Sequence, residues 1–356
     1  MTASTRATAL RKRLDGPLKL AISLALMALL LRAVHWREIF AVLTHIHAGW
    51  FALALLLFQL GVLVRAARWQ ILLRAGGVPA PLALLVRWYF IGSLFNTVLP
   101  TGFGGDAVKT VALGRYAGRP GVVLGSVLLD RFSGMAMQMP IGIMALLLAP
   151  GAASPAVGWL LGLLFGACAL IVLLMARRDW ALALQRRFPA VARVKAGQIL
   201  LDAIPTYGLR PLLASFGVSL IFNALLIGLN ICLGLAVGAA IPWRYYLIFV
   251  PLISVSLVLP SFGGLGVREF SYMALFTQVG VTPAAAAAMG LLFYAVTMGG
   301  ALVGGILYLT PAAWWEPAPD RRRVVHVPPY LGVRGPTAGD APQGSPDSRS
   351  LGVEQP

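Results

Sequence analysis

The sequence has 356 residues, of which 59% are hydrophobic and 12% are charged, and its mean hydropathy is +0.82. A soluble domain carries about 25% charged residues, so this composition predicts an integral membrane protein and excludes ordinary cytosolic enzymes and secreted disulfide scaffolds. The formal net charge is +17. Because long apolar stretches separate the basic residues, we interpret this charge as basic cytoplasmic loops facing anionic lipid, and we expect no nucleic-acid partner.

Six apolar stretches are candidates for full membrane spans, because a spanning helix needs roughly 20 predominantly apolar residues. The first follows a basic N-terminal segment, 1–17, and has no small-residue cleavage site after it. We therefore interpret it as an uncleaved helix and not as a signal peptide. The predicted spans are 18–34, 50–64, 120–149, 157–176, 211–238 and 284–310.

Two further apolar stretches, 81–116 and 245–280, are interrupted in the middle by proline and glycine. Proline ends a helix and leaves carbonyl groups that a cavity or a neighbouring helix must satisfy. Each stretch therefore predicts a helix–break–helix hairpin, either re-entrant or fully spanning. The interrupting residues are Pro100, Gly104 and Gly105 in the first stretch and Pro260, Gly263 and Gly264 in the second.

Basic residues concentrate in five clusters, the largest of which lies in segment 177–210. If the N-terminus is cytoplasmic and each broken stretch returns to the side from which it enters, all five clusters lie on the cytoplasmic side, as the positive-inside rule requires. We therefore predict a multi-pass protein of the bacterial inner membrane with both termini in the cytoplasm.

The order of these elements predicts an internal repeat within a transmembrane domain at 18–315. Half one, 18–149, and half two, 157–310, each contain two spans, a hairpin and a further span, and they start from opposite sides of the membrane. Inverted repeats with broken helices are typical of transporters. Residues 316–356 are rich in Pro, Gly and Ser, which predicts a disordered cytoplasmic tail. The predicted fold is an all-α polytopic membrane protein.

Charged residues inside apolar spans are candidates for function. Asp130 and Arg131 lie about 15 Å into the 120–149 span, near the centre of the bilayer. Neighbouring helix positions point about 100° apart, so the two side chains can face different helices. One interpretation is a buried ion pair that holds helices together. The other is that Arg131 meets an anionic head group, with Asp130 as its counter-charge.

The two breaks carry further candidates. In the first, the amides of Gly104 and Gly105 can bind an anion at a helix N-terminus, with Lys109 beside Asp106; alternatively, Asp106 only caps the helix and the glycines only make the turn. In the second, Arg268 and Glu269 enter an apolar run. We expect Glu269 to pair across the repeat interface or to bind protons.

Several other polar residues allow simpler interpretations. Asn223 and Asn230 share one helix face, either as contacts between helices or as part of a cavity lining. Arg65 and Arg68 follow the second predicted span, where reaching lipid phosphate at the interface is a sufficient role. The sequence contains no nucleophile constellation, phosphate-binding loop or zinc signature, so we expect no cofactor and no metal.

The ordered motifs resemble the lysylphosphatidylglycerol synthase transmembrane-region family, also called flippase-like. The motifs are NTVLP at 96–100, GGD at 104–106, DR at 130–131, LP at 259–260 and GGLGVRE at 263–269. The resemblance covers about residues 10–315 and implies lipid translocation, because in the bacterial multiple peptide resistance factor this region moves aminoacylated phosphatidylglycerol to the outer leaflet. By motif position it indicates Asn96, Asp106, Arg131 and Glu269 for the lipid path.

One departure from the resistance factor matters. That protein continues into a soluble synthase domain, and here a short tail follows, so we expect no lipid synthesis by this chain and no enzyme activity. Stand-alone relatives in hopanoid and polyprenyl-linked glycan pathways leave the lipid open.

These observations predict a flippase for a polar or anionic lipid, working through a cavity between the two hairpins, with a lipid-synthesising enzyme as a possible partner. The alternatives are an integral-membrane transferase acting on a lipid-linked donor, with Asp106 or Glu269 as base, and a lipid-binding accessory subunit that does not transport. The predicted head-group path comprises Asn96, Gly104, Gly105, Asp106, Lys109, Asp130, Arg131, Gly263, Gly264, Arg268 and Glu269.

Overall fold

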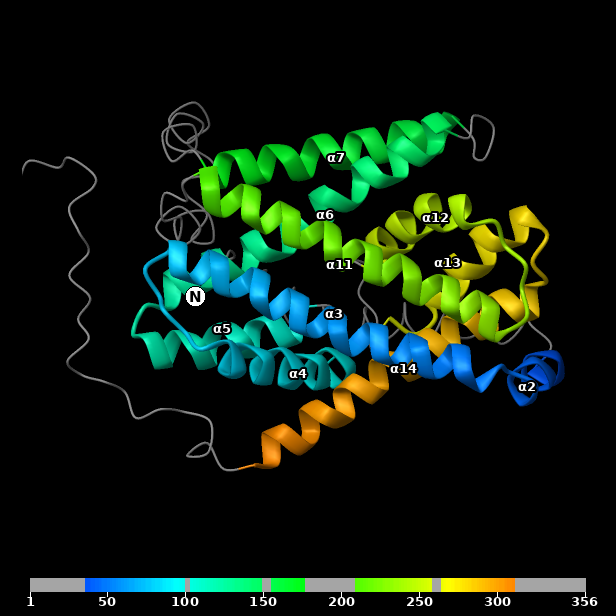
Figure 1. Ribbon diagram of the computed structural model, residues 1–356, viewed down its shortest axis with the longest axis horizontal. Coiled ribbons are helices and arrows are strands. Elements are labelled where there is room, and N and C mark those ends of the chain that lie inside the picture. The colour runs from blue at the N-terminus through cyan, green and yellow to red at the C-terminus, as the bar shows by residue number, and fades with distance from the viewer. Residues whose placement is uncertain (1–35, 100–102, 149–154, 177–208, 258–263, 311–356) are drawn as a thin grey trace, which may run out of the picture. The chain divides into compact units, whose positions relative to one another are not determined.

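A computed structural model of the chain describes residues 36–99, 103–148, 155–176, 209–257 and 264–310 (Figure 1). The predicted first span at 18–34, nearly all of the basic segment 177–210 and the predicted tail at 316–356 lie outside the described residues. So do three break residues, Pro100, Pro260 and Gly263.

The described part contains ten α-helices and no strand, which confirms the all-α polytopic fold. Four helices are long and apolar enough to cross a membrane. They are α3 (Ala48–Ala75), α6 (Pro120–Leu148), α11 (Leu209–Ala236) and α14 (Pro283–Leu309). A fifth apolar helix, α7 (Pro155–Ala176), lies at the position of the predicted span 157–176.

The second span begins before Trp50, as so short an apolar stretch indicates, but its end differs from the prediction. The prediction ended it at residue 64, whereas α3 has 28 residues and continues to Ala75, about three turns further. The continuation is possible because Arg68 finds a charged partner inside the protein and does not require water. A short helix, α2 (Trp36–Thr44), precedes α3 and was not predicted.

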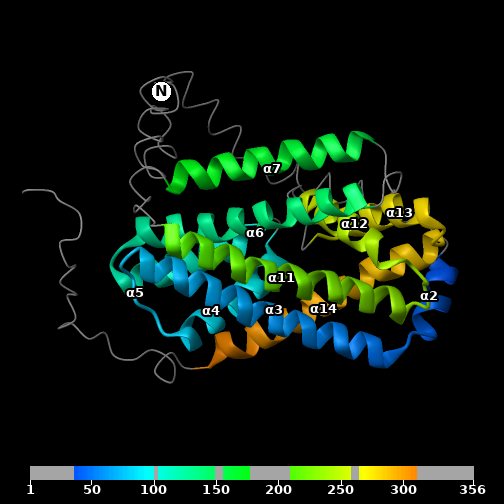
Figure 2. The same cartoon turned by 45° about the horizontal axis from the view of Figure 1, so that its top comes forward.

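Both broken stretches form the expected helix–break–helix pairs. The first comprises α4 (Leu82–Val98) and α5 (Gly104–Ala117), and the second α12 (Trp243–Ser256) and α13 (Val267–Phe276). In Figures 1 and 2, α4 and α5 occupy one end of the helix bundle and α12 and α13 the other, so the two hairpins enter from opposite ends.

The main helix contacts of the two halves correspond among the described residues. α3 and α11, which run in opposite directions side by side, form the centre (Figure 2). The first hairpin packs through α4 against α14, and the second packs through α12 against α6. Likewise α5 packs on α6 and α13 on α14. Exchanging the halves exchanges these contacts, which is the arrangement that an inverted repeat requires.

Close backbone approach holds the first hairpin in place. A Cβ atom on Gly304 of α14 would lie 2.0 Å from the Phe90 carbonyl oxygen of α4, and one on Gly105 would lie 2.0 Å from the Gly92 carbonyl oxygen. Only glycine fits at such crossings, where small residues let helix backbones meet.

An aromatic core supports the second hairpin. Phe276 of α13 packs edge-to-face on Phe249 of α12, with ring centroids 5.2 Å apart, and stacks with Tyr272 at 5.5 Å. The Tyr272 hydroxyl donates a hydrogen bond to Asn230 of α11. Asn230 therefore contacts a neighbouring helix, which was the first of its two predicted roles.

Candidate functional site

Two adjoining hollows, of about 270 and 300 Å³, lie in the middle of the bundle between the halves. They share much of their lining, so we treat them as one space, the central cavity. The shared residues come from five helices and the end of α12: Arg65, Ser93, Asn96, Arg131, Phe222, Leu226, Leu257 and Phe293. Both halves of the repeat therefore contribute to its walls.

The described lining of the central cavity has more cations than anions. Two carboxylates, Asp106 and Asp130, line it. Five cationic side chains do so: Arg65, Arg68, Lys109, Arg131 and Arg268. Such an excess in a space of low dielectric attracts an anion.

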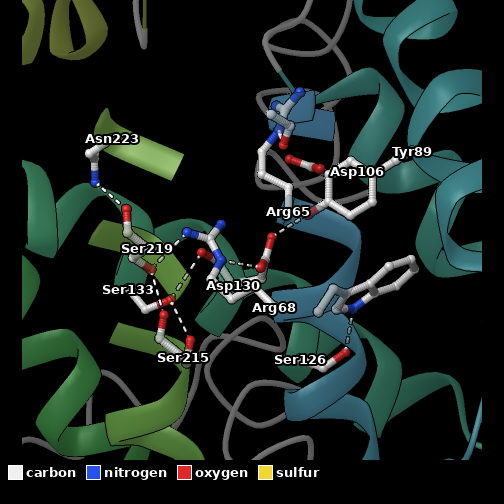
Figure 3. A network of polar contacts seen from close by, with 12 residues as sticks. Arg65, Arg68, Tyr89, Asp106, Ser126, Asp130, Ser133, Ser215, Ser219 and Asn223 are labelled. Atoms are coloured by element: carbon white, nitrogen blue, oxygen red, sulfur yellow. Dashed lines mark hydrogen bonds and ion pairs between the residues drawn. The ribbon is translucent and has the colours of Figure 1, made fainter. Parts of the chain in front are cut away.

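Asp130 belongs to a buried network that joins several helices (Figure 3). Its carboxylate accepts a hydrogen bond from Arg68 Nε at 2.6 Å and another from the Tyr89 hydroxyl. Arg68 Nη1 also donates to Ser219 Oγ of α11 at 2.9 Å. The interpretation of Arg68 as an interfacial residue is therefore wrong: its side chain is 3% exposed and paired. Of the two predicted roles of Asp130, the structure favours the ion pair between helices.

Asp106 forms a second charged cluster, which links α5 to α6. Its carboxylate oxygens lie 2.8 Å from Lys109 Nζ and 2.5 Å from Arg131 Nη1. Lys109 lies over the Tyr89 ring at 3.9 Å, and Arg131 lies over the Phe103 ring at 4.1 Å. Asp106 thus pairs with cations, Lys109 among them, and the alternative in which it only caps the helix does not describe its contacts. Although Asp130 and Arg131 are sequence neighbours, they pair with different helices.

Arg65 also departs from its predicted interfacial role. Its guanidinium lies 5.2 Å from the Phe222 ring centroid and 5.4 Å from that of Tyr89, within the lining of the central cavity. Its Nε donates to the Gly61 carbonyl at 3.4 Å. Among the described residues no carboxylate forms an ion pair with it. Cation–π contacts with aromatic rings hold this arginine in the protein.

Arg268 and Glu269 are neighbours with different surroundings. Arg268 is 5% exposed and lines the central cavity, its guanidinium 4.6 Å from the Phe293 ring centroid. Its Nε and Nη1 have no hydrogen-bond partner among the described residues. Glu269 is fully buried, and its Oε2 accepts the Gly266 amide of its own helix start at 2.7 Å. The structure therefore shows Glu269 as a helix cap, outside the described cavity lining, and not paired across the repeat interface.

The amide of Gly105 in the first break is engaged within the hairpin. Gly105 N–H donates to Asn96 Oδ1 at 2.7 Å, so Asn96 ties the end of α4 to the start of α5 while it also lines the central cavity. Neither Gly104 nor Gly105 belongs to the described lining. The structure thus assigns both glycines to close packing, whereas Gly264 of the second break does line the cavity.

Residues 17–305 match the family described as "Lysylphosphatidylglycerol synthase TM region". The chain belongs to this family. The match includes every described residue of the central cavity and both hairpins. For this member of the lysylphosphatidylglycerol synthase TM region family, a role connected with membrane lipid follows. No curated protein and no solved structure matches the chain.

Sequence reasoning missed Arg65, Arg68 and Tyr89 of this family member's cavity. The apolar residues Leu72 and Leu73 follow Arg68, but an arginine near the end of an apolar run looks the same in the sequence whether it is buried or interfacial. No signal marked Tyr89. Among the described residues no group of three His, Cys, Asp or Glu side chains is placed to hold a metal ion.

Proposed function

We propose that the chain translocates a lipid with an anionic head group across the bacterial inner membrane, through the central cavity. The observation that carries this proposal is the cation excess of a cavity placed between helices of membrane-spanning length. A role in membrane lipid chemistry follows from the family, and the charge of the cavity supports an anionic head group in particular.

Three arginines supply the head-group contacts in this proposal. Arg65, Arg131 and Arg268 line the same hollow, where no described lining residue is a carboxylate. A buried guanidinium such as that of Arg268, whose Nε and Nη1 have no hydrogen-bond partner among the described residues, is unfavourable until an anion compensates it. A phosphodiester bound there would accept charge-assisted hydrogen bonds from these side chains.

The opposed hairpins support a transport cycle of alternating exposure. Because they enter from opposite ends, a shift of one half against the other would open the cavity first to one end and then to the other. The sequence contains no phosphate-binding loop for a nucleotide, so we propose downhill exchange or coupling to protons through Asp106, one of the two carboxylates that line the cavity. In this proposal the chain is not an enzyme.

Replacing Arg268 tests the head-group site. Arg268→Gln removes a buried cation that lacks hydrogen-bond partners on two nitrogens, so we expect the protein to fold while phosphatidylglycerol exchange in proteoliposomes slows. A charge-assisted hydrogen bond contributes about 1.5–3 kcal/mol, which predicts a loss of roughly tenfold to one hundredfold. Exchange is measured by quenching fluorescent lipid from one side.

Arg244→Gln is the matched control, because Arg244 is an exposed arginine at the start of α12 that lines no described cavity. We expect its exchange rate to equal that of wild type. Wild-type rates no faster than those of protein-free vesicles would contradict translocation. In that case, product formation from a lipid-linked donor would favour the transferase, and co-purification of a lipid-synthesising enzyme would favour the accessory role.

A further inference from the structure

A third hollow, of about 360 Å³, lies between α5 and α6, on the outer side of the Asp106–Arg131 ion pair. We call it the lateral groove. Its described lining is Phe103, Asp106, Ala107, Thr110, Val111, Leu124, Val127, Leu128 and Arg131. The groove and the central cavity have only Asp106 and Arg131 in common. One ion pair therefore stands between a charged space and an apolar one.

The walls of the lateral groove are apolar apart from that pair and Thr110. The Thr110 hydroxyl donates to the Asp106 carbonyl of its own helix at 2.8 Å, so its hydrogen is already used. On the α5 side, Phe103 and Val111 are 46% and 52% exposed. On the α6 side, Val127 is only 4% exposed and forms the floor. The groove thus runs from an exposed apolar rim inward to an apolar floor, and Asp106 and Arg131 present only apolar atoms to it.

We propose that the lateral groove holds an acyl chain of the transported phospholipid, and that the Asp106–Arg131 pair separates this chain from the head group in the central cavity. This inference rests on the proposed function. The continuity of the two spaces identifies the occupant, because a phospholipid joins an anionic group to an apolar chain and both meet at these two residues.

The contacts of Asp106 allow the Asp106–Arg131 ion pair to break. Asp106 has two cationic partners, Lys109 at 2.8 Å and Arg131 at 2.5 Å. When Arg131 turns to a lipid phosphate, Asp106 keeps Lys109 and is not left as an unpaired buried charge, which would be strongly unfavourable. Arg131 likewise exchanges one anion for another. The glycerol region of the lipid can therefore pass between α5 and α6 without leaving a charge uncompensated.

Photo-crosslinking with phosphatidylglycerol that carries a diazirine on one acyl chain tests the groove directly. In nanodiscs containing the full chain, we expect adducts on Val127 at the floor of the groove, which is out of reach of lipid that only surrounds the protein, and on the half-buried Leu124 beside it. Leu163 of α7, which is 72% exposed, reports that surrounding lipid. Adducts on Leu163 with none on Leu124 or Val127 would overturn the proposal.

A substitution that fills the groove gives the second arm. Ala107→Trp places a large ring at an exposed, groove-lining position of α5, and we expect the adducts on Val127 to fall at least fivefold while those on Leu163 persist. Ala224→Trp is the control, an exposed alanine on α11 that lines none of the three hollows. Unchanged Val127 adducts in folded Ala107→Trp protein would contradict the proposal.

The two proposals fail separately in these experiments. Adducts on the groove floor without lipid exchange would support an acyl chain in the lateral groove and contradict the proposed translocation. Exchange that depends on Arg268, with no adducts on the groove floor, would support the proposed translocation and contradict an acyl chain in the lateral groove. The wild-type adduct map decides the second case even if the tryptophan variant does not fold.

Discussion

At the scale of single residues, removing one partner of the Arg68–Asp130 pair is expected to destabilise the fold strongly. Both side chains are nearly inaccessible, and the carboxylate also accepts the Tyr89 hydroxyl. Arg68→Met leaves Asp130 as a buried charge without its cation, for which we expect a loss of about 3–5 kcal/mol in the free energy of unfolding. Equilibrium unfolding of the purified protein in detergent measures this change in the free energy of unfolding.

The double variant Arg68→Met/Asp130→Leu distinguishes the net contribution of the ion pair from the cost of leaving one buried charge unpaired. Replacing a buried pair with apolar side chains is often neutral, so we expect the double variant to be more stable than Arg68→Met alone. Additive losses would show that Arg68 and Asp130 act independently.

These residues also show what sequence reasoning can reach. The depth of Asp130 in its span follows from the position in an apolar run, and so does the divergence of Asp130 and Arg131 onto different faces. The partner of Asp130 could not be predicted, because Arg68 stands near the end of an apolar run, where a buried and an interfacial arginine look alike. Only tertiary packing distinguishes the two.

At the scale of elements, the crossing of α4 and α14 depends on a single glycine. A Cβ atom at Gly304 would lie 2.0 Å from the Phe90 carbonyl oxygen, whereas one at Gly305 would meet no atom within 4 Å. Gly304→Ala forces the helices apart, and overpacking of this kind costs about 1–3 kcal/mol. We expect Gly304→Ala to lower the unfolding temperature in detergent.

Gly305→Ala is the matched control one position along α14. Alanine is favoured over glycine in a helix interior by about 0.5–1 kcal/mol, so this variant should be as stable as wild type or more stable. Equal effects of the two alanines would refute the importance of the crossing.

The hairpins could be predicted because proline and glycine interrupt an apolar run, and this interruption is visible in the sequence. The length of α3 could not be predicted in the same way, because hydropathy falls at Arg65 and Arg68 although the helix continues. Helix ends are therefore predictable where backbone chemistry sets them. They are not predictable where a buried ion pair extends the helix.

At the scale of the whole molecule, the correspondence of contacts between the halves adds information that no single motif carries. The sequence gives two similar breaks in one order, and the structure adds that α4 packs on α14 as α12 packs on α6. Because each hairpin packs on a helix of the other half, both halves are needed to enclose the cavity. Neither half alone encloses the three arginines, since Arg65 and Arg131 come from half one and Arg268 from half two.

The arrangement of the hairpins makes a prediction about sidedness. Arg115 lies in the last turn of α5, at the open end of the first hairpin, and Ala240 lies before α12, at the open end of the second. Because the hairpins enter from opposite ends, cysteines at these positions should react with an impermeant maleimide from opposite sides of the membrane. The positive-inside rule assigns Arg115 to the cytoplasm and Ala240 to the outside.

Both positions are exposed, and the native cysteines, Cys168 and Cys232, are buried, so the native thiols are shielded from the maleimide and can stay in place. Labelling of intact cells should modify Ala240→Cys, and Arg115→Cys should react only after the membrane is opened. Reaction of both from the outside would contradict the opposed hairpins. It would also remove the alternating exposure on which the proposed transport depends, because a cavity bounded by hairpins from one side has no second end to open.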